Sequence, residues 1–176
     1  MLLLAAFLLM AGSAADDYAT RICRKLASET EVRFVTDADV TISARTAGRI
    51  ELSTGLFARL QNEAELAGVL AHQVAHMSAG TECIRFLHSE DKREEDRQQE
   101  RAADEAAIPA LIKAGYDPAA MLQFFSKYRR EGADLPKAFS AEDLLIEKLQ
   151  IEATDHPLKD ALVNTSEFDR LRATVK

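Results

Sequence analysis

The sequence predicts an α+β domain that is mostly helical and carries a small β-sheet near its N-terminus. Short segments with strand-like composition are confined to residues 31–53. After residue 62 the apolar residues recur at helical spacing, between recognisable helix caps. The chain has 176 residues, of which 47% are hydrophobic and 29% charged, so its composition fits one globular domain. Its formal net charge of −7 argues against nucleic-acid binding, which needs a cationic surface.

The first fifteen residues, MLLLAAFLLMAGSAA, are predicted to be a signal peptide, so that residues 16–176 form the mature single domain. This apolar run is too short for a transmembrane helix, and it ends in the small residues Ser13 and Ala15. We therefore expect an exported protein, periplasmic or associated with the cell envelope, with no transmembrane segment in the mature chain. No Lys or Arg precedes the apolar run, which leaves a different start codon or an N-terminal anchor as alternatives.

The N-terminal third of the chain is expected to contain one helix and the sheet. Residues 17–30 are predicted to form a helix with Ile22 and Leu26 on one face. EVRFV (31–35) is a predicted strand, followed by a turn at residues 36–39. VTISA (40–44) and RIELS (49–53) are predicted to form a hairpin.

The central helix has clear boundaries in the sequence. Asn62 is a suitable N-cap, with Glu65 three residues later as in a capping box, and Gly80 is a natural stop. His72 and His76 then lie one turn apart on one side of this helix.

Further helices are predicted after a charge run at residues 89–101, which we interpret as a solvated helix face or an exposed connection. RAADEAAIPALIKAG predicts a helix that stops at Gly115, with a bend at Pro109. Asp117-Pro118 predicts the start of the next helix, which Gly132 ends. Another helix is predicted to begin at Ser140, and His156-Pro157 marks the boundary before the last one.

Two pairs of side chains have the spacing of metal ligands. Zinc in a catalytic site takes three protein ligands, and histidines at positions i and i+4 can direct both imidazoles to one point. His72 and His76 have this spacing, but the same spacing is common for polar residues that simply pack. Glu100 and Asp104 are also four apart: Glu100 is a candidate ligand, and Asp104 could accept the second N–H of a histidine ligand. The alternative is an exposed acidic pair.

Several ordered motifs resemble the gluzincin peptidases related to the CAAX prenyl protease, HtpX and BepA. GRIELSTGLFARLQNEAELAGVLAHQVAH resembles the strand, turn and active-site helix of that family, ERAADEAAIPALIKAGYDPAAMLQFF resembles its ExxAD helix, and DHP (155–157) its late His-Pro motif. The resemblance extends from about residue 40 to residue 160 and implies a zincin-like metallopeptidase domain that binds Zn²⁺ and acts on polypeptides.

The resemblance also implies roles for particular residues. His72, His76 and Glu100 would be the zinc ligands and Asp104 the acid behind them. His156 would lie near the metal, or would only shape the turn at Pro157. The strand at Ser43, Ala44 and Arg45, where relatives often carry Asn-Ala-Phe, would contact an extended substrate.

Gln73 departs from the family pattern at the position of the catalytic glutamate. That glutamate takes a proton from the zinc-bound water, and general acid–base help of this kind is typically worth about 10²–10⁴-fold in rate. The amide of Gln73 cannot accept the proton, so zinc and peptide binding should survive while turnover collapses. A chain that keeps the zinc ligands but lacks the catalytic base is either an engineered inactive variant or a natural pseudoenzyme.

Three functional hypotheses remain open at this point. The first is a zinc metalloendopeptidase of the cell envelope that acts on unfolded or misassembled proteins, with activity impaired by Gln73. The second is a non-catalytic zinc- and peptide-binding module with a chaperone-like or regulatory role, and the third is a helical protein whose histidines only pack. Separately, Cys23 and Cys83 could form a disulfide in an oxidising compartment, or be two buried thiols.

Overall fold

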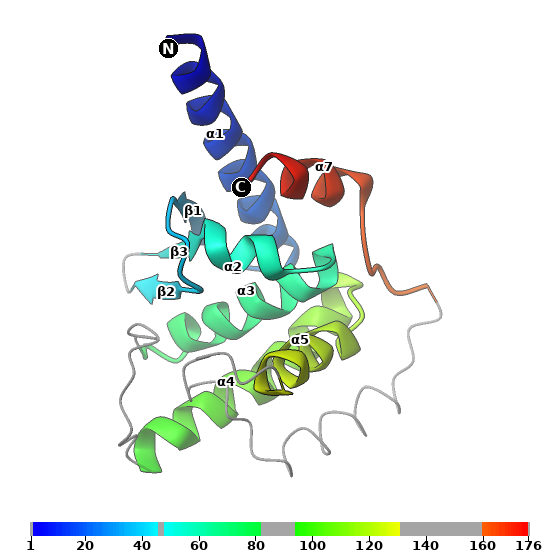
Figure 1. Ribbon diagram of the computed structural model, residues 1–176. Coiled ribbons are helices and arrows are strands. Elements are labelled where there is room, and N and C mark those ends of the chain that lie inside the picture. Colours follow the sequence, from blue (N-terminus) through cyan, green and yellow to red (C-terminus); the bar gives the residue numbers. More distant parts are fainter. Residues whose placement is uncertain (1, 46–47, 82–93, 131–159, 176) are drawn as a thin grey trace.

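A computed structural model of the chain describes residues 2–45, 48–81, 94–130 and 160–175 (Figure 1). Helices dominate these residues, and a small sheet follows the first helix, which confirms the predicted α+β class. In chain order the elements are α1 (Leu2–Lys25), β1 (Glu31–Val35), β2 (Ile42–Arg45), β3 (Arg49–Ser53), α2 (Thr54–Arg59), α3 (Glu63–Ser78), α4 (Glu94–Ala114), α5 (Ala119–Arg130) and α7 (Ser166–Thr174). None of the helices in the described ranges is long and apolar enough to cross a lipid bilayer.

The three strands form one sheet in the order β1-β3-β2. β2 and β3 make the predicted antiparallel hairpin, with Ile42 opposite Leu52 and Ala44 opposite Ile50. β1 pairs with β3 in parallel, so the two strands that follow each other in the sequence, β1 and β2, lie on opposite sides of β3. Ile50 and Leu52 are buried, and their burial fixes the face of β3 that meets the core.

Helix α1 ends earlier than the sequence suggested. The predicted helix extended to residue 30, whereas α1 ends at Lys25 and a tight turn follows it. Ala27 has a φ of 59°, and the N–H of Ser28 donates to the carbonyl of Cys23 (2.9 Å), which closes the last turn. A glycine in the sequence signals where a chain can adopt a positive φ, whereas an alanine gives no such signal. Ile22 and Leu26, which were predicted to share one face, are both buried.

The predicted signal peptide is not tested by these observations. α1 continues without a break through Ala15 and Asp16, the predicted cleavage point. The Asp16 carboxylate accepts a hydrogen bond from the main-chain N–H of Phe34 (2.7 Å), which ties α1 to β1. The division into residues 1–15 and 16–176 stays a prediction.

A short helix, α2, was missing from the sequence-based prediction. Ser53 ends β3 and also caps α2, because its hydroxyl accepts the N–H of Leu56 (3.0 Å). The same hydroxyl donates to the carbonyl of Asp39 (2.6 Å), which holds the loop before β2 against the start of the helix. Ser-Thr-Gly-Leu after a strand was the available signal.

The boundaries of α3 agree with the prediction. The Asn62 side chain accepts the N–H of Glu65 (2.8 Å), and the Glu65 carboxylate accepts the N–H of Gln61 (2.7 Å), one residue beyond the N-cap. At the other end, Gly80 adopts a φ of +69°, a conformation that favours glycine.

Helix α4 begins inside the charge run, at Glu94, and continues through Pro109 to Ala114. The helical interpretation of that part of the run is therefore confirmed. Gly115 then turns the chain with a φ of +82°, and the Asp117 carboxylate accepts the N–H of Ala119 at the start of α5 (2.9 Å). The predicted helix at Ser140 lies outside the described residues, as does the His156-Pro157 boundary.

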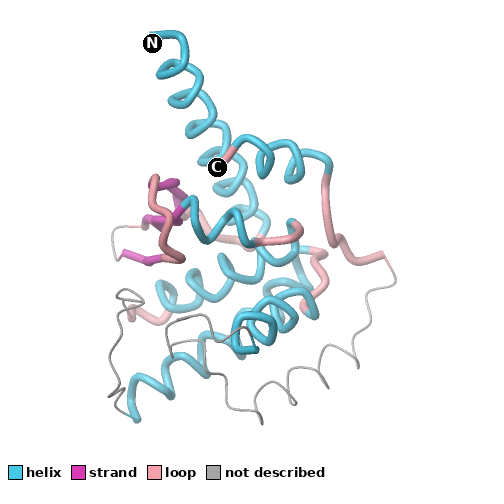
Figure 2. Tube along the Cα trace, in the orientation of Figure 1, coloured by secondary structure: helices cyan, strands magenta, loops and turns pink. Residues whose placement is uncertain are grey.

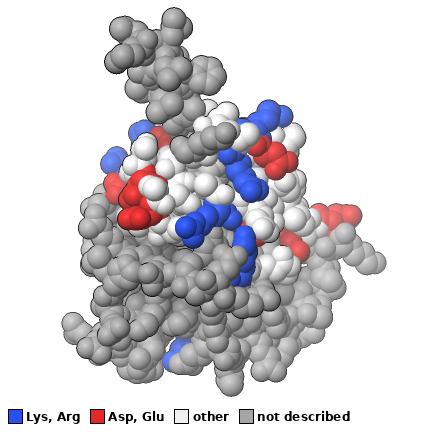
Figure 3. Space-filling view, viewed as in Figure 1, with Lys and Arg blue, Asp and Glu red and all other residues white. Residues whose placement is uncertain are grey.

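Helix α3 is the central element of the fold. It packs against α1, α4, α5 and β2, and in Figures 1 and 2 it lies between the sheet with α2 and the pair α4 and α5. Gly68 permits the close approach of α5, because a Cβ atom there would lie 2.6 Å from the Cβ of Met121. Acidic and basic side chains are interspersed over the described part of the surface seen in Figure 3.

Candidate metal centre

The two predicted histidine ligands lie side by side on the C-terminal half of α3. His72 is 1% exposed and His76 is 2% exposed, and their Nε2 atoms are 3.1 Å apart. This arrangement follows from the helix, since residues four apart stand one turn above each other on the same face. The ring of Phe125 on α5 meets the His72 ring edge-on, with 6.3 Å between the ring centroids.

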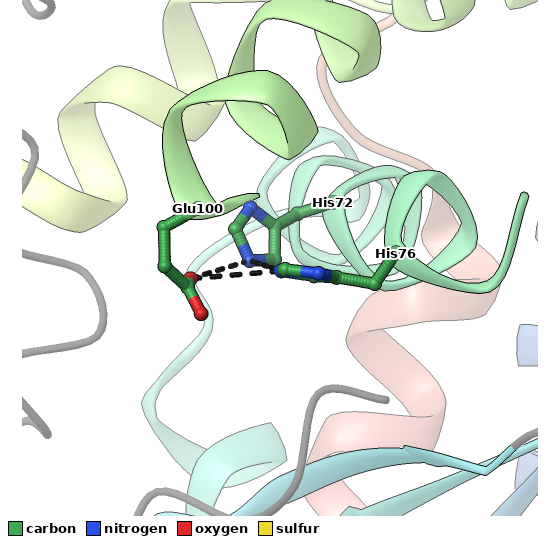
Figure 4. Close-up of side chains that lie close together, drawn as sticks. All are labelled: His72, His76 and Glu100. Carbon is green, nitrogen blue, oxygen red and sulfur yellow. Dashed lines mark hydrogen bonds and ion pairs between the residues drawn. The ribbon is translucent and has the colours of Figure 1, made fainter. Parts of the chain in front are cut away.

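Glu100 extends from α4 toward both imidazoles (Figure 4). Its Oε2 atom lies 3.3 Å from His72 Nε2 and 3.6 Å from His76 Nε2. One nitrogen from each histidine and one oxygen of Glu100 thus converge from two helices that pack on each other. The structure therefore brings these three side chains together, as the sequence predicts.

Asp104 stands one turn after Glu100 on α4 and lies behind His72. Its Oδ1 atom is 2.7 Å from His72 Nδ1, and both side chains are buried. A carboxylate can only accept at this distance, so His72 carries its proton on Nδ1 and leaves the lone pair of Nε2 directed at Glu100 and His76. From this position the Asp104 carboxylate can orient the His72 ring, and its role beside a metal ion stays a prediction.

Thr81 is a neighbour of the site that the sequence-based analysis did not single out. Its hydroxyl oxygen lies 3.1 Å from His76 Nδ1 and donates to the main-chain carbonyl of His76 (3.0 Å). The available signal was its place directly after Gly80, because the residue after a helix-ending glycine folds back over the last turn.

The electrostatics of the site favour a cation. Burial raises the pKa of the Glu100 carboxyl, but hydrogen bonds and charge interactions with His72 and His76 in their protonated form lower it by more, so its pKa lies well below the usual range. The anionic oxygen of Glu100 therefore faces two imidazole nitrogens at short distance. Three electron-rich atoms this close repel one another unless a proton or a metal ion lies among them.

The geometry of the three atoms also fits zinc. Nitrogen and oxygen ligands bind zinc at about 2.0–2.2 Å, so neighbouring ligands of a tetrahedral site lie about 3.3–3.6 Å apart. The separations among His72 Nε2, His76 Nε2 and Glu100 Oε2 are 3.1, 3.3 and 3.6 Å. Two imidazoles and one carboxylate are also a donor set that zinc accepts, with a fourth position left for water.

Gln73 is fully buried on α3, between the two histidines in the sequence. A side-chain amide carries neither charge nor a titratable proton at neutral pH. Gln73 therefore adds no negative charge to the site, whereas a glutamate at the same position would.

The predicted substrate strand lies at one side of the sheet. Ser43, Ala44 and Arg45 belong to β2, and no described strand pairs with the outer side of β2. Ala44 is buried and Ser43 is half-buried. β2 packs against α3, the helix that carries the histidines.

The hydrogen-bond register of β2 determines which main-chain groups face outward. The N–H of Ser53 donates to the carbonyl of Thr41 (2.9 Å), so these two residues form a hydrogen-bonded antiparallel pair. Because such pairs alternate along a strand, Ser43 directs its N–H and carbonyl toward β3. Ile42 and Ala44 direct theirs away from it, toward the outer side of the sheet.

Two further predictions concern residues outside the described ranges. His156 is one of them, so its proposed position near the metal stays a prediction. Cys83 is the other: Cys23 is buried in the core, and its pairing with Cys83 stays a prediction.

Comparisons with known proteins agree with this geometry over part of the chain. Residues 15–91, which contain α3 with both histidines, match the profile of peptidase family M48. The chain is also similar to a Vibrio cholerae protein described as a beta-barrel assembly-enhancing protease, with 26% identity over 136 residues. That similarity covers 56% of this chain and 28% of the relative, so the chain spans little more than a quarter of the relative's length.

Proposed function

Because the chain belongs to peptidase family M48, as its residues 15–91 indicate, we propose that it is a zinc metalloendopeptidase domain of the cell envelope whose turnover is impaired by Gln73. The observation that carries the proposal is the convergence of His72, His76 and Glu100 on one position. This convergence favours a metal site over histidines that merely pack, because packing alone does not require three acceptor atoms to meet.

The four polar side chains around that position would share two tasks in the proposed site. His72, His76 and Glu100 would hold Zn²⁺, and Asp104 would keep the His72 ring in its ligating orientation. Bound zinc would supply a water of lowered pKa and would polarise the carbonyl of a peptide bond.

The amide of Gln73 limits what the site can do chemically. It can donate or accept a hydrogen bond and so help to position a water molecule or a peptide. It cannot take up a proton and pass it to a leaving nitrogen, and loss of this function is worth about 10²–10⁴-fold in rate. We therefore expect binding without efficient cleavage.

The proposed substrate is an unfolded or misassembled polypeptide, which would bind as an additional strand along β2. The outward main-chain groups of Ile42 and Ala44 supply the donors and acceptors that such a strand needs. Recognition through the main chain depends little on side chains, which suits a protease that acts on varied unfolded proteins. The location in the envelope rests on the predicted signal peptide and on the relative described as enhancing β-barrel assembly.

The test restores the missing carboxylate. Gln73→Glu, the unaltered chain and Gln73→Leu are purified and incubated with an unfolded protein, while bound zinc is measured on all three. Cleavage by Gln73→Glu alone, with about one zinc per chain in each protein, is the expected result. Absence of zinc from all three proteins would overturn the proposal.

Gln73 also favours a second candidate, a non-catalytic module that binds zinc and peptide in a chaperone-like or regulatory role. In that case the unaltered chain and Gln73→Glu both bind zinc and an extended peptide, and neither cleaves it. The same experiment therefore separates the two functions, provided that peptide binding is measured beside cleavage.

A further inference from the structure

We propose that Thr81 is a positioning residue of the metal site, whose hydroxyl holds His76 in the tautomer that directs Nε2 at the metal position. The inference rests on the proposed zinc site and adds to it the group that supports the second histidine. His72 has the carboxylate of Asp104 behind it, and Thr81 occupies the corresponding place behind His76.

The end of α3 explains why Thr81 lies against His76. The N–H of Thr81 donates to the carbonyl of His76 (3.0 Å), and the N–H of Gly80 donates to the carbonyl of Met77 (3.1 Å). These two bonds, with Gly80 at a φ of +69°, are the pattern of a Schellman motif. In that motif the residue after the glycine folds back over the residue five positions earlier, here the histidine ligand.

The direction of the hydrogen bonds then follows from counting protons. A threonine hydroxyl has one hydrogen, and it is used in the bond to the His76 carbonyl (3.0 Å). The hydroxyl oxygen therefore accepts from His76 Nδ1, 3.1 Å away, and Nδ1 must carry the proton. The lone pair of His76 then lies on Nε2, the atom that faces His72 and Glu100.

Asp104 and Thr81 would support their histidines with different strength. An anionic acceptor holds an N–H more firmly than a neutral hydroxyl and makes the ring a stronger ligand. Loss of an orienting partner typically lowers metal affinity about 10–100-fold. We expect Thr81→Val, which keeps the shape and removes the hydroxyl, to weaken zinc binding by about 10-fold, and Asp104→Asn to weaken it by more.

Thr81→Ser is the matched control, since it keeps the hydroxyl and loses only a methyl group. Zinc affinity of the full chain is measured by competition with a chelator for the unaltered protein, Thr81→Ser and Thr81→Val. Near-native affinity in Thr81→Ser with a clear loss in Thr81→Val supports the inference. Equal affinity in all three overturns it and leaves the zinc site in place, whereas absence of zinc from the unaltered chain points to failure of the proposed function instead.

A second measurement tests the tautomer without any metal. Nitrogen-15 NMR of the imidazole groups in the metal-free protein, at a pH where His76 is neutral, distinguishes a proton on Nδ1 from one on Nε2. We expect Nδ1–H for His76 in the unaltered chain and in Thr81→Ser, and a shift toward Nε2–H in Thr81→Val. An Nε2–H tautomer in the unaltered chain would overturn the inference whether or not zinc binds.

Discussion

The two ends of α3 each contain a buried polar cluster, and the two clusters differ in how their charges are balanced. At the N-terminal end, the carboxylate of Glu63 is surrounded by groups that donate hydrogen bonds. At the C-terminal end, His72, His76 and Glu100 direct acceptor atoms at one another. The Glu63 carboxylate has its hydrogen-bond donors within the protein and needs no ligand. The acceptor atoms of the second cluster repel one another, and a bound cation would remove this repulsion.

The Glu63 cluster connects segments that are far apart in the sequence. The hydroxyl of Tyr18 donates to Glu63 at 2.6 Å and that of Tyr116 at 2.7 Å, and Thr165 donates to the same carboxylate. The ammonium of Lys25 lies 3.4 Å away. α1, the α4–α5 turn and the start of α7 thereby meet at the first turn of α3.

The pKa directions in the Glu63 cluster fit this description. Burial raises the pKa of Glu63, but the three hydroxyl donors and Lys25 lower it by more in sum, so the carboxyl stays ionised. Burial, and then the hydrogen bond to Glu63, raise the pKa of Tyr18 and of Tyr116. The phenols therefore remain protonated donors. A cluster balanced in this way stabilises the fold, whereas an unbalanced one creates a binding site.

The largest expected effect is on stability, and it should be confined to the N-terminal cluster. Glu63→Ala leaves two buried phenols and a threonine hydroxyl without their acceptor, and we expect a loss of about 3–5 kcal/mol in the free energy of unfolding. Glu100→Ala in metal-free protein leaves no buried hydroxyl group of the described residues without its acceptor, so its loss should be smaller than that of Glu63→Ala. Urea unfolding in the presence of a chelator measures both. A larger loss for Glu100→Ala would contradict the comparison.

Zinc should raise the cost of Glu100→Ala to about that of Glu63→Ala. A ligand that binds only the folded state adds about 4 kcal/mol at a concentration 1,000 times its dissociation constant. The unaltered chain should gain this stability with added zinc, and Glu100→Ala should lose most of the gain. Repeating the urea unfolding with excess zinc provides the measurement, and an equal gain in both proteins would place the zinc elsewhere.

The next expected effect is on the pH dependence of stability. The pKa of Glu63 in the folded chain lies below its usual value of 4.5, so its contribution is complete above the unfolded-state pKa and is lost as the pH falls through the folded pKa. The difference in unfolding free energy between the unaltered chain and Glu63→Gln should be constant from about pH 8 to about pH 5.5 and should shrink toward about pH 3. Metal-free protein is used, and a difference that grows in acid would show the opposite sign of shift.

The metal centre was largely predictable from the sequence, whereas the Glu63 cluster was not. Helical spacing makes His72 with His76, and Glu100 with Asp104, candidates only, and the resemblance to the gluzincin peptidases supplies their expected roles. Glu63 draws its three hydroxyl donors from positions 45 to 102 residues away, and only the tertiary fold brings these together. The local periodicity of a sequence does not reveal contacts between residues so far apart.

The errors in the predicted elements have a similar origin. α1 ends five residues before its predicted end, because Ala27 takes a left-handed conformation that its residue type does not announce. α2 was missed because Ser53 belongs to a strand and caps a helix at once. The place of Thr81 against His76 follows from the Schellman turn at Gly80, a residue that the sequence marks only as a helix stop.

The smallest expected effect sharpens the description of the Glu63 cluster. The Lys25 ammonium lies 3.4 Å from Glu63 and 3.1 Å from the Tyr116 hydroxyl, but the lysine side chain is 50% exposed. Solvent weakens such a pair, so Lys25→Met, which keeps the apolar stem, should lower the free energy of unfolding by only about 0.5–1 kcal/mol.

Arg21→Met is the control for the Lys25 variant, because Arg21 lies on the same helix as Lys25 and forms an exposed ion pair with Glu167 of α7. We expect it to cost less than Lys25→Met, since its ion-pair partner Glu167 is exposed. In a Glu63→Gln background the cost of Lys25→Met should nearly vanish, and urea unfolding of the single and double variants gives this coupling. If Lys25→Met costs as much as Glu63→Ala, the ammonium and not the three hydroxyl groups keeps the buried carboxylate ionised, and the N-terminal cluster is an ion pair rather than a hydrogen-bonded one.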